Sequence, residues 1–489
     1  MALMAATLAA APVHKSPMAG QWFPQEKAAL EKALEESFRA AEKRSGALPP
    51  RKRMLALIAP HAGIQYSGVV AASGYRLLNG PRNVILLGFS HRRPLEGVVI
   101  PDVEGYETPL GQVAVNRKIA AELGFPRRTE AELCDHSLEN QLPFLQRAAP
   151  AATLVPLYVG ELGPAELAAA SRALAARLAA GDFIVASSDF THHGETYKYT
   201  PFPNDSNLPR KLLQRAMQAF ENIGTLEVEE FDRFLAATGD TICGRQPIRL
   251  LMAALARLKE DTYLSPIDYM ASGDLTRDWS LSVGYGALGF YPASAFQVGD
   301  EDRRKLLRSA RQTLERYLGG ARERAPVPSA ERGPELEQRT GVFVTVRKKG
   351  ELRGCIGTLS AGAPLWDLVA DRTLAATTAD PRFPPLAREE GPVALEVSLL
   401  TPLKRIRDWR RFRLGQGAVL LLGEKSGLLL PQVAREFGWN QEQFLENLSR
   451  KAGLDAKAYR QPNATLYVYG AQVFGEPGSQ PRAVTGVDH

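Results

Sequence analysis

Three apolar stretches of the chain each end at a histidine-containing motif: Met54–Gly63 (MLALIAPHAG), Asn83–His91 (NVILLGFSH) and Phe183–His193 (FIVASSDFTHH). Their apolar runs show no polar alternation, which is typical of strands in a sheet that is buried on both faces. Segments with helical periodicity separate them, for example Arg117–Leu123 and Pro164–Ala180. Strands that alternate with helices predict a three-layer α/β domain with a mostly parallel sheet.

The polar residues that follow these strands predict a functional site. In open α/β sheets ligands bind beyond the carboxyl ends of the strands, so we expect His61, His91 and the segment Asp189–His193 to share one crevice. A fourth motif, Thr241–Pro247 (TICGRQP), places Cys243 just before a predicted helix, whose N-terminus should favour the thiolate. Two histidines and one anionic sulfur predict a transition-metal site with open positions, which suits Fe(II) or copper better than a closed zinc site.

The loop after the third strand supplies further polar groups. Asp189 and His192 are three positions apart, which would allow a proton relay beside the metal, and the alternative is that either one is itself a ligand. His136, within Cys134–Asn140 (CDHSLEN), precedes a predicted helix and either faces the same crevice or is a helix-capping neighbour. The candidate catalytic residues are thus Asp189, His192 and His136, while His14 receives no role.

A different pattern begins near residue 300. A helix is predicted over Glu301–Leu318, residues 322–333 form a loop or linker, and strands and turns follow residue 340, which indicates a second, α+β domain. Its motif Glu351–Thr358 (ELRGCIGT) offers Arg353 as a fixed cation for an acidic ligand and Cys355 between two glycines. Because no histidine or acidic cluster is near Cys355 in the sequence, a packed, buried thiol is favoured over a nucleophile.

The composition limits the possible classes of protein. The chain has 489 residues and a net charge of +6, with basic residues spread along it, so no nucleic-acid partner is expected. Its three cysteines are each about 110 residues apart, which excludes a disulfide framework and favours a reducing cytoplasm. No apolar run approaches about 18 residues, so no membrane span is predicted. The apolar N-terminus lacks a preceding Lys or Arg, which favours a disordered tail over a signal peptide.

Several motifs together resemble known families. In the first part of the chain HAGIQYSG, GFSH, DHSLENQLPF, SSDFTHHG and TICGRQPI resemble the Memo family, whose fold is similar to that of class III extradiol ring-cleaving dioxygenases. In the second part GVFVTVRKKGELRGCIGTL, DPRFPPL and LLLPQVAREFGWNQEQFL resemble the AMMECR family. The combination looks like a fusion of proteins B and A of the AmmeMemoRadiSam system, whose third member is a radical SAM protein.

This resemblance implies a domain organisation and a set of metal ligands. It implies a Memo-like metal-binding domain over 15–298 and an AMMECR-like domain over 299–475, while the composition of the two ends predicts disordered tails over 1–14 and 476–489. It also implies metal ligation by His61, His91 and Cys243, with Asp189 and His192 lining the pocket. These are the residues that the strand ends had already indicated.

The resemblance further implies a function. We expect an Fe(II)-dependent enzyme, with copper as the other metal, that uses O2 on a small-molecule or peptide substrate and acts with a radical SAM partner. The dioxygenases have a carboxylate as their third ligand, whereas this chain offers Cys243, which argues against ring cleavage. The alternative is a non-enzymatic metal-binding scaffold or chaperone that binds a peptide or a partner protein. Metal-free binding by both halves is disfavoured by the convergence of the two histidines and the cysteine.

Overall fold

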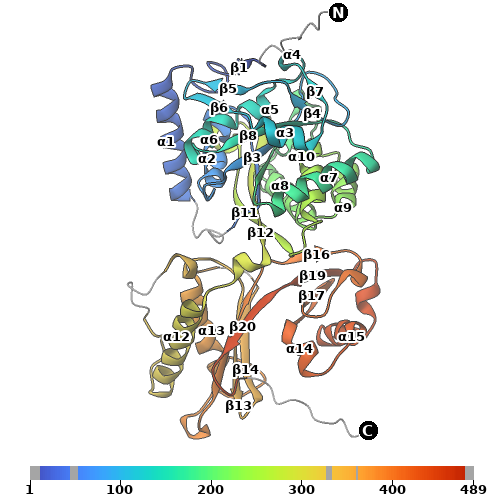
Figure 1. Cartoon of the computed structure of the whole chain (residues 1–489). Coiled ribbons are helices and arrows are strands. Elements are labelled where there is room, and N and C mark those ends of the chain that lie inside the picture. Colours follow the sequence, from blue (N-terminus) through green and yellow to red (C-terminus); the bar gives the residue numbers. More distant parts are fainter. Residues whose placement is uncertain (1–10, 45–52, 327–332, 360–361, 480–489) are drawn as a thin grey trace, which may run out of the picture. The chain divides into compact units, whose positions relative to one another are not determined.

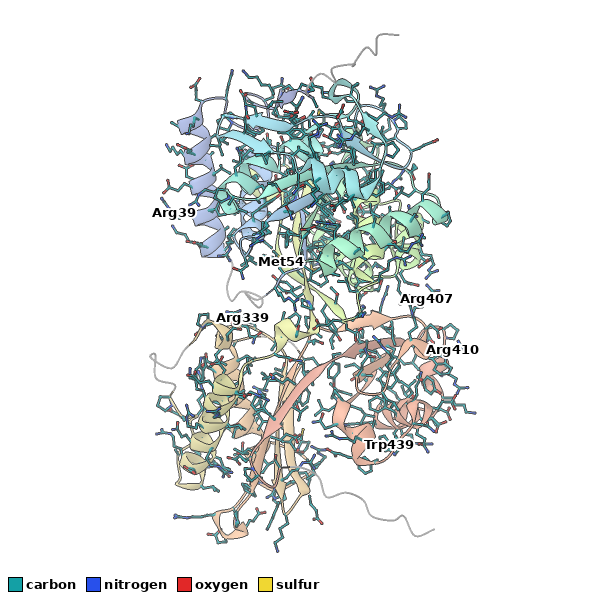
Figure 2. The ribbon with its side chains drawn as sticks, in the orientation of Figure 1. Arg39, Met54, Arg339, Arg407, Arg410 and Trp439 are labelled. Carbon is teal, nitrogen blue, oxygen red and sulfur yellow. The ribbon has the colours of Figure 1, made fainter. Side chains whose placement is uncertain are left out.

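The computed structural model describes residues 11–44, 53–326, 333–359 and 362–479. Among these residues the chain forms two compact units, of which the first ends at Tyr291 and the second begins at Pro292. Both units combine helices with sheets, so this is a mixed α/β protein with several sheets (Figure 1). Figure 2 shows the side chains that fill the space between the elements of each unit. Within the described residues, no helix has both the length and the apolar character needed to cross a membrane.

The centre of the first unit is a nine-stranded sheet, built from β2 (Ala56–Ala59), β3 (Asn83–Gly88), β4 (Val98–Pro101), β7 (Arg127–Arg128), β8 (Thr153–Val159), β9 (Phe183–Ser187), β10 (His192–His193), β11 (Thr262–Ala271) and β12 (Ser282–Pro292). The strand order is β10-β12-β2-β9-β3-β8-β4-β7, with β11 paired to β12. The neighbours β2, β9, β3 and β8 run parallel, whereas β12 and β4 run antiparallel to the central strands that they join. The sheet is therefore parallel in its centre and mixed toward its edges.

Helices pack on both faces of this sheet (Figure 1): α3 (Arg117–Leu123), α7 (Pro164–Ala179), α8 (Leu208–Gly224), α9 (Val228–Thr238) and α10 (Arg245–Leu255) on one face, and α1 (Lys27–Arg44), α2 (Ile64–Tyr75) and α6 (Leu142–Ala148) on the other. Successive strand residues point to opposite faces, so Ala56 and Ile58 pack in one core and Leu57 and Ala59 in the other. Burial on both sides explains why these strands carry no polar alternation.

The register of the central strands positions the histidine motifs. Ala59 at the end of β2 pairs with Ser187 at the end of β9, and Leu87 near the end of β3 pairs with Ala186. The three strands run parallel, so their carboxyl ends lie at the same edge of the sheet. The motifs that follow them therefore leave the sheet side by side.

The N-terminal segment belongs to a separate three-stranded sheet of β1 (Val13–Lys15), β5 (Gly105–Thr108) and β6 (Gly111–Ala114). His14 lies in β1 and pairs with Tyr106 of β5, so the prediction of a tail over residues 1–14 is wrong for its last residues. Residues 1–10 of that prediction lie outside the described residues. A strand of three residues is too short to show a periodic apolar pattern, which is why the sequence did not reveal it.

The second unit contains two antiparallel four-stranded sheets. The first, in the order β14-β13-β15-β20, is built from β13 (Val342–Lys348), β14 (Glu351–Thr358), β15 (Ala394–Leu400) and β20 (Ala471–Gly475). The second, in the order β16-β19-β17-β18, is built from β16 (Lys404–Ile406), β17 (Gly417–Leu422), β18 (Lys425–Leu429) and β19 (Thr465–Tyr469). The first sheet packs with α12 (Asp300–Leu318) and α13 (Leu365–Thr378), and the second with α14 (Pro431–Glu436) and α15 (Gln441–Lys451).

The loop after α12 differs in detail from expectation. Within the segment 322–333, Arg324 forms an ion pair with Asp367 of α13, so this part packs inside the second unit and does not link two domains. Residues 327–332 lie outside the described residues.

The predicted C-terminal tail over residues 476–489 begins too early. Glu476 accepts a hydrogen bond from the Leu395 N–H at 2.9 Å and forms an ion pair with Arg311 of α12. Residues 480–489 lie outside the described residues. The polar composition after β20 concealed these contacts because they depend on partners distant in the sequence.

Candidate metal centre

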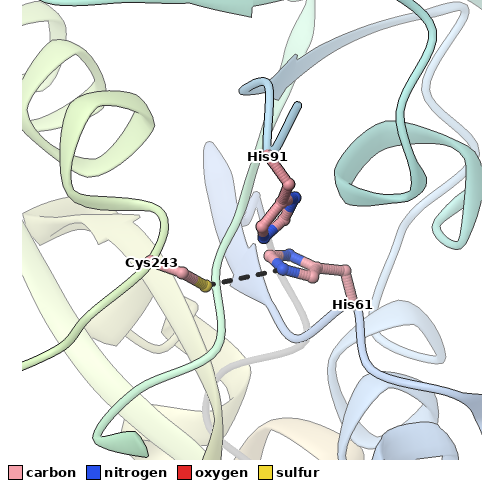
Figure 3. Close-up of side chains that lie close together, drawn as sticks. All are labelled: His61, His91 and Cys243. Carbon is pink, nitrogen blue, oxygen red and sulfur yellow. Dashed lines mark hydrogen bonds between the residues drawn. The ribbon is translucent and has the colours of Figure 1, made fainter. Parts of the chain in front are cut away.

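His61, His91 and Cys243 lie together at the edge of the sheet where β2, β3 and β9 end. One ligand-type atom of each residue lies within 4.8 Å of those of the other two. Figure 3 shows the two imidazole rings next to each other, nearly perpendicular at an interplanar angle of 77°, with the Cys243 sulfur directed at His61. The first unit thus brings together three side chains that could hold a metal ion and that are far apart in the sequence.

Hydrogen bonds fix the ring of His61, which is only 2% exposed. Its Nδ1 lies 2.9 Å from Ser187 Oγ at the end of β9, and its Nε2 lies 3.5 Å from Cys243 Sγ. Asp189 Oδ1 accepts a hydrogen bond from the His61 N–H at 2.9 Å, and Asn140 Nδ2 donates to the His61 carbonyl at 2.7 Å. Burial, with a smaller effect of the neighbouring histidines, lowers the pKa of His61 well below its ordinary value. The ring is therefore neutral, which is the form that binds a metal.

The ring of His91 is oriented by Asp135. His91 Nδ1 lies 2.9 Å from Asp135 Oδ1, and the His91 N–H donates to Asp135 Oδ2 at 3.0 Å. Asp135 also caps the short helix α5 (His136–Glu139), since its Oδ1 accepts from the Ser137 N–H at 2.9 Å. Burial opposes ionisation of Asp135, but its hydrogen bond to His91 and the other contacts lower its pKa below the ordinary value. Such a carboxylate–histidine pair holds the ring so that Nε2 is available to a metal.

Cys243 is held between β9 and the start of α10. Its Sγ accepts a hydrogen bond from the Asp189 N–H at 3.3 Å, and the following Gly244 donates its N–H to Ser188 Oγ at 3.1 Å. A Cβ on Gly244 would lie 2.4 Å from the Ser187 carbonyl oxygen, so this close approach requires glycine. Burial, with the charge of Asp189, raises the pKa of the Cys243 thiol well above its ordinary value. The prediction that the helix N-terminus favours the thiolate is therefore wrong, because burial outweighs it; a coordinated cation deprotonates such a thiol.

Asp189 and His192 lie on the Cys243 side of the centre. Ligand-type atoms of these three residues lie within 4.8 Å of one another. His192 Nδ1 lies 3.1 Å from the Thr241 carbonyl oxygen, so Nδ1 carries the hydrogen and Nε2 is left as an acceptor. Burial raises the pKa of Asp189 to about 7, although backbone N–H donors of His61 and its neighbour oppose the shift. At these positions Asp189 and His192 could form a proton relay beside the metal, and either one could instead be a metal ligand.

His136 covers the ring of His91. Its own ring centroid lies 4.0 Å from that of His91, with an interplanar angle of 20°, and 4.3 Å from the ring system of Trp22 on the opposite side. Burial, with the charge of His91, lowers the pKa of His136 to about 4. His136 thus lies beside the metal centre as a neutral, stacked ring and is also the first residue of α5.

An open cleft of about 900 Å³ adjoins the centre. Both His91 and Cys243 line it, together with Arg92, Arg93 and Glu161. A small molecule or a peptide side chain in this cleft would reach the two cleft-lining ligands of the centre.

The candidate residues of the second unit are engaged by neighbouring side chains. Arg353 donates to both carboxylate oxygens of Glu390, at 2.8 and 2.6 Å, so its charge is already paired. Cys355 Sγ accepts a hydrogen bond from Thr345 Oγ1 at 3.3 Å, and burial raises the pKa of its thiol. These contacts describe a packed strand residue, although Cys355 is partly exposed and not fully buried.

Two residues that sequence reasoning missed, Ser187 and Asp135, orient the histidine ligands. Ser187 is the last residue of β9, and only the parallel pairing with β2 shows that it faces His61. Asp135 precedes His136 in the CDHSLEN motif, and this acidic residue beside a histidine was the one available signal. Its contact with His91 depends on how α5 packs against the end of β3.

Comparison with known proteins agrees with the division of the chain into two units. Residues 15–289 match the Memo-like protein family and residues 307–474 match AMMECR1. The chain is 41% identical over 189 residues to a protein of Methanothermobacter thermautotrophicus, covering 36% of this chain and 96% of that one. It is 31% identical over 290 residues to protein MEMO1 of Danio rerio, covering 55% of this chain and 94% of that one.

One solved structure among those similar to this chain is uncharacterized protein PH0010 from Pyrococcus horikoshii. It is 35% identical in sequence, with a TM-score of 0.35, and the match covers 38% of this chain and 96% of that one. From the family matches, the chain belongs to the Memo-like family and carries an AMMECR1 segment after the Memo-like one. The predicted Memo–AMMECR fusion is confirmed.

Proposed function

We propose that the Memo-like part is a metal-dependent oxidoreductase that holds Fe(II) at His61, His91 and Cys243 and uses O2 to oxidise a small molecule or a peptide. One observation supports this most strongly: the three donor groups lie within 4.8 Å of one another at the ends of parallel strands. Each imidazole has its Nδ1 in a hydrogen bond, which leaves Nε2 for a metal.

The donor set fits a redox-active metal. Two neutral imidazoles and one thiolate occupy three coordination positions and leave others open, as O2-using Fe(II) sites require. Copper suits the same donors. Bound iron would supply the electrons for reaction with O2. The side chains of the centre do not supply electrons in this way.

The residues around the donors would position the substrate and accept a proton from it. His192 has its Nδ1–H directed at the Thr241 carbonyl, so its Nε2 can accept a proton from a substrate bound next to Cys243. Asp189 lies on the same side and completes the proposed relay. The cleft beside the centre supplies the space for a substrate, with Arg92 and Arg93 along its lining.

The AMMECR1 segment and the family combination support a role in a pathway. We propose that the fused chain acts in the cytoplasm with a radical SAM protein of the AmmeMemoRadiSam system. The substrate would then be a compound that the radical SAM protein makes or consumes, and it should accumulate when the gene for the present chain is deleted.

Two linked measurements test the proposed activity. Anaerobic loading with Fe(II), followed by removal of excess metal and elemental analysis, should show iron that is lost in His91→Ala and Cys243→Ser and kept in the matched control Cys355→Ser. The Fe(II)-loaded protein should then consume O2 with metabolite extract from the deletion strain, and Cys243→Ser should not. Iron binding without O2 consumption, with the metal still reduced, would instead support the scaffold or chaperone alternative.

A further inference from the structure

A second group of metal-binding side chains lies in the first unit: His14 in β1, Cys134 directly after the short helix α4 (Glu130–Leu133), and Glu139 in α5. One ligand-type atom of each lies within 4.8 Å of the others, and none of the three belongs to the centre described above. Cys134 is 2% exposed and Glu139 is fully buried. The group is therefore enclosed, unlike the centre beside the open cleft.

The buried carboxylate of Glu139 has His14 as a charged neighbour but no hydrogen-bond donor in the described part of the chain. Within the described residues, neither of its oxygens accepts a hydrogen bond. His14 Nε2 lies 3.3 Å from Glu139 Oε1, but that nitrogen has no hydrogen-bond partner either. Buried carboxylates are normally paired, hydrogen-bonded or bound to a metal. A cation between Glu139, His14 and Cys134 would satisfy both unpartnered groups together.

The surroundings of His14 and Cys134 resemble those of metal ligands. His14 Nδ1 lies 3.2 Å from Glu130 Oε2, which orients the ring and leaves Nε2 on the side of Glu139. Histidines that bind metals usually donate their other N–H to a carboxylate or carbonyl in this way. The Tyr106 hydroxyl lies 3.9 Å from Cys134 Sγ and can donate to a thiolate there.

The charges and donor types select the metal. A thiolate and a carboxylate together carry two negative charges, which a divalent cation neutralises, and an imidazole binds such a cation in its neutral form. Sulfur, nitrogen and oxygen donors in one set suit Zn²⁺, which accepts all three and prefers four-coordinate geometry. We propose that His14, Cys134 and Glu139 bind one Zn²⁺ ion, with a water molecule as the fourth ligand.

This zinc site would have a structural role. It would join β1 to the segment 134–139, which contains both Asp135, the partner of His91, and His136, which stacks on His91. Zinc at this point would therefore hold the segment that orients a ligand of the neighbouring centre.

The test uses the full chain with His91→Ala and Cys243→Ser, so that zinc at the first centre is not counted. After loading with Zn²⁺ and dialysis against a weak chelator, we expect about one zinc per chain, because each structural site holds one ion. Adding Cys134→Ser should weaken Zn²⁺ binding by roughly 100-fold or more, and adding Glu130→Gln by roughly 10- to 100-fold. The matched control, Cys355→Ser in the same background, should retain the zinc.

Glu139→Gln keeps the side-chain volume and tests the site if Cys134→Ser fails to fold. It should also release the zinc, and Co²⁺ in the parent double variant should show a thiolate charge-transfer band. The proposal is overturned if the double variant retains no zinc, if Co²⁺ gives no such band, or if a folded Cys134→Ser variant retains zinc. The group would then be a buried His14–Glu139 ion pair.

Discussion

The substitution Asp135→Asn tests how the sequence around α5 controls the metal centre without changing a proposed ligand. Asp135 makes three hydrogen bonds: with His91 Nδ1 at 2.9 Å, with the His91 N–H at 3.0 Å and with the Ser137 N–H at 2.9 Å. The cap of α5 and the His91 ring share Oδ1, so an amide with its oxygen at that position keeps these two contacts and loses the one from the His91 N–H to Oδ2. The segment that carries His91 is then held less firmly, and without the carboxylate charge the His91 Nε2 is a weaker base.

Loss of such an outer partner usually weakens metal binding by about 10- to 100-fold, which corresponds to roughly 1.4–2.7 kcal/mol. Asparagine is nearly as good a helix cap as aspartate, so the loss of folding stability should be about 1–2 kcal/mol, from one unsatisfied buried donor. The assay is anaerobic competition for Fe(II) between the protein and a coloured chelator. Asp102→Asn, at an exposed carboxylate paired with Arg127, is the control and should bind iron normally. Unchanged affinity in folded Asp135→Asn would refute the orienting role.

Three further outcomes follow from the same contacts. His192→Ala should retain iron but slow O2 consumption by about 10²- to 10⁴-fold, the usual contribution of a positioned acid or base, whereas loss of iron would make His192 a ligand. Leu86→Ala, at a fully buried position of β3, should cost about 2–5 kcal/mol in urea unfolding, against about 0.5 kcal/mol or less for Leu275→Ala at 47% exposure; equal costs would contradict the described core. A hydrogen bond from Arg382 holds the pKa of Asp380 at about 2, so its stabilisation is present above its unfolded value near pH 4 and is lost as pH falls toward 2. The stability of the wild type should therefore fall more steeply over that range than that of Asp380→Asn, and parallel curves would exclude the effect.

Much of the first unit could be predicted because its central strands are buried on both faces. The apolar runs ending at Ala59, Leu87 and Ala186 are strands for that reason, and the helices between them carry regular apolar stripes. β12 escaped prediction although all of its residues are buried, because its glycines interrupt the apolar run. A Cβ on Gly286 would lie 2.7 Å from the Phe190 ring, so this glycine serves packing rather than a turn.

The metal centre could be predicted only as far as strand ends determine position. His61 and His91 follow parallel strands, so their proximity follows from the topology alone. The partners that orient them come from α5 and from the last residue of β9, and these contacts depend on packing between elements. The state of the Cys243 thiol was predicted wrongly because a sequence shows the helix that follows the cysteine but not the burial around it.

Iron X-ray absorption on the Fe(II)-loaded chain tests the central claim most directly, because it reports which atoms bind the metal. The account predicts one sulfur scatterer together with nitrogen or oxygen scatterers. That sulfur signal should persist in Cys134→Ser and Cys355→Ser, and any iron that Cys243→Ser still holds in excess Fe(II) should show no sulfur scatterer. A spectrum of the wild type without sulfur, or a sulfur signal that survives in folded, iron-loaded Cys243→Ser, would contradict the assignment of His61, His91 and Cys243 as the iron ligands.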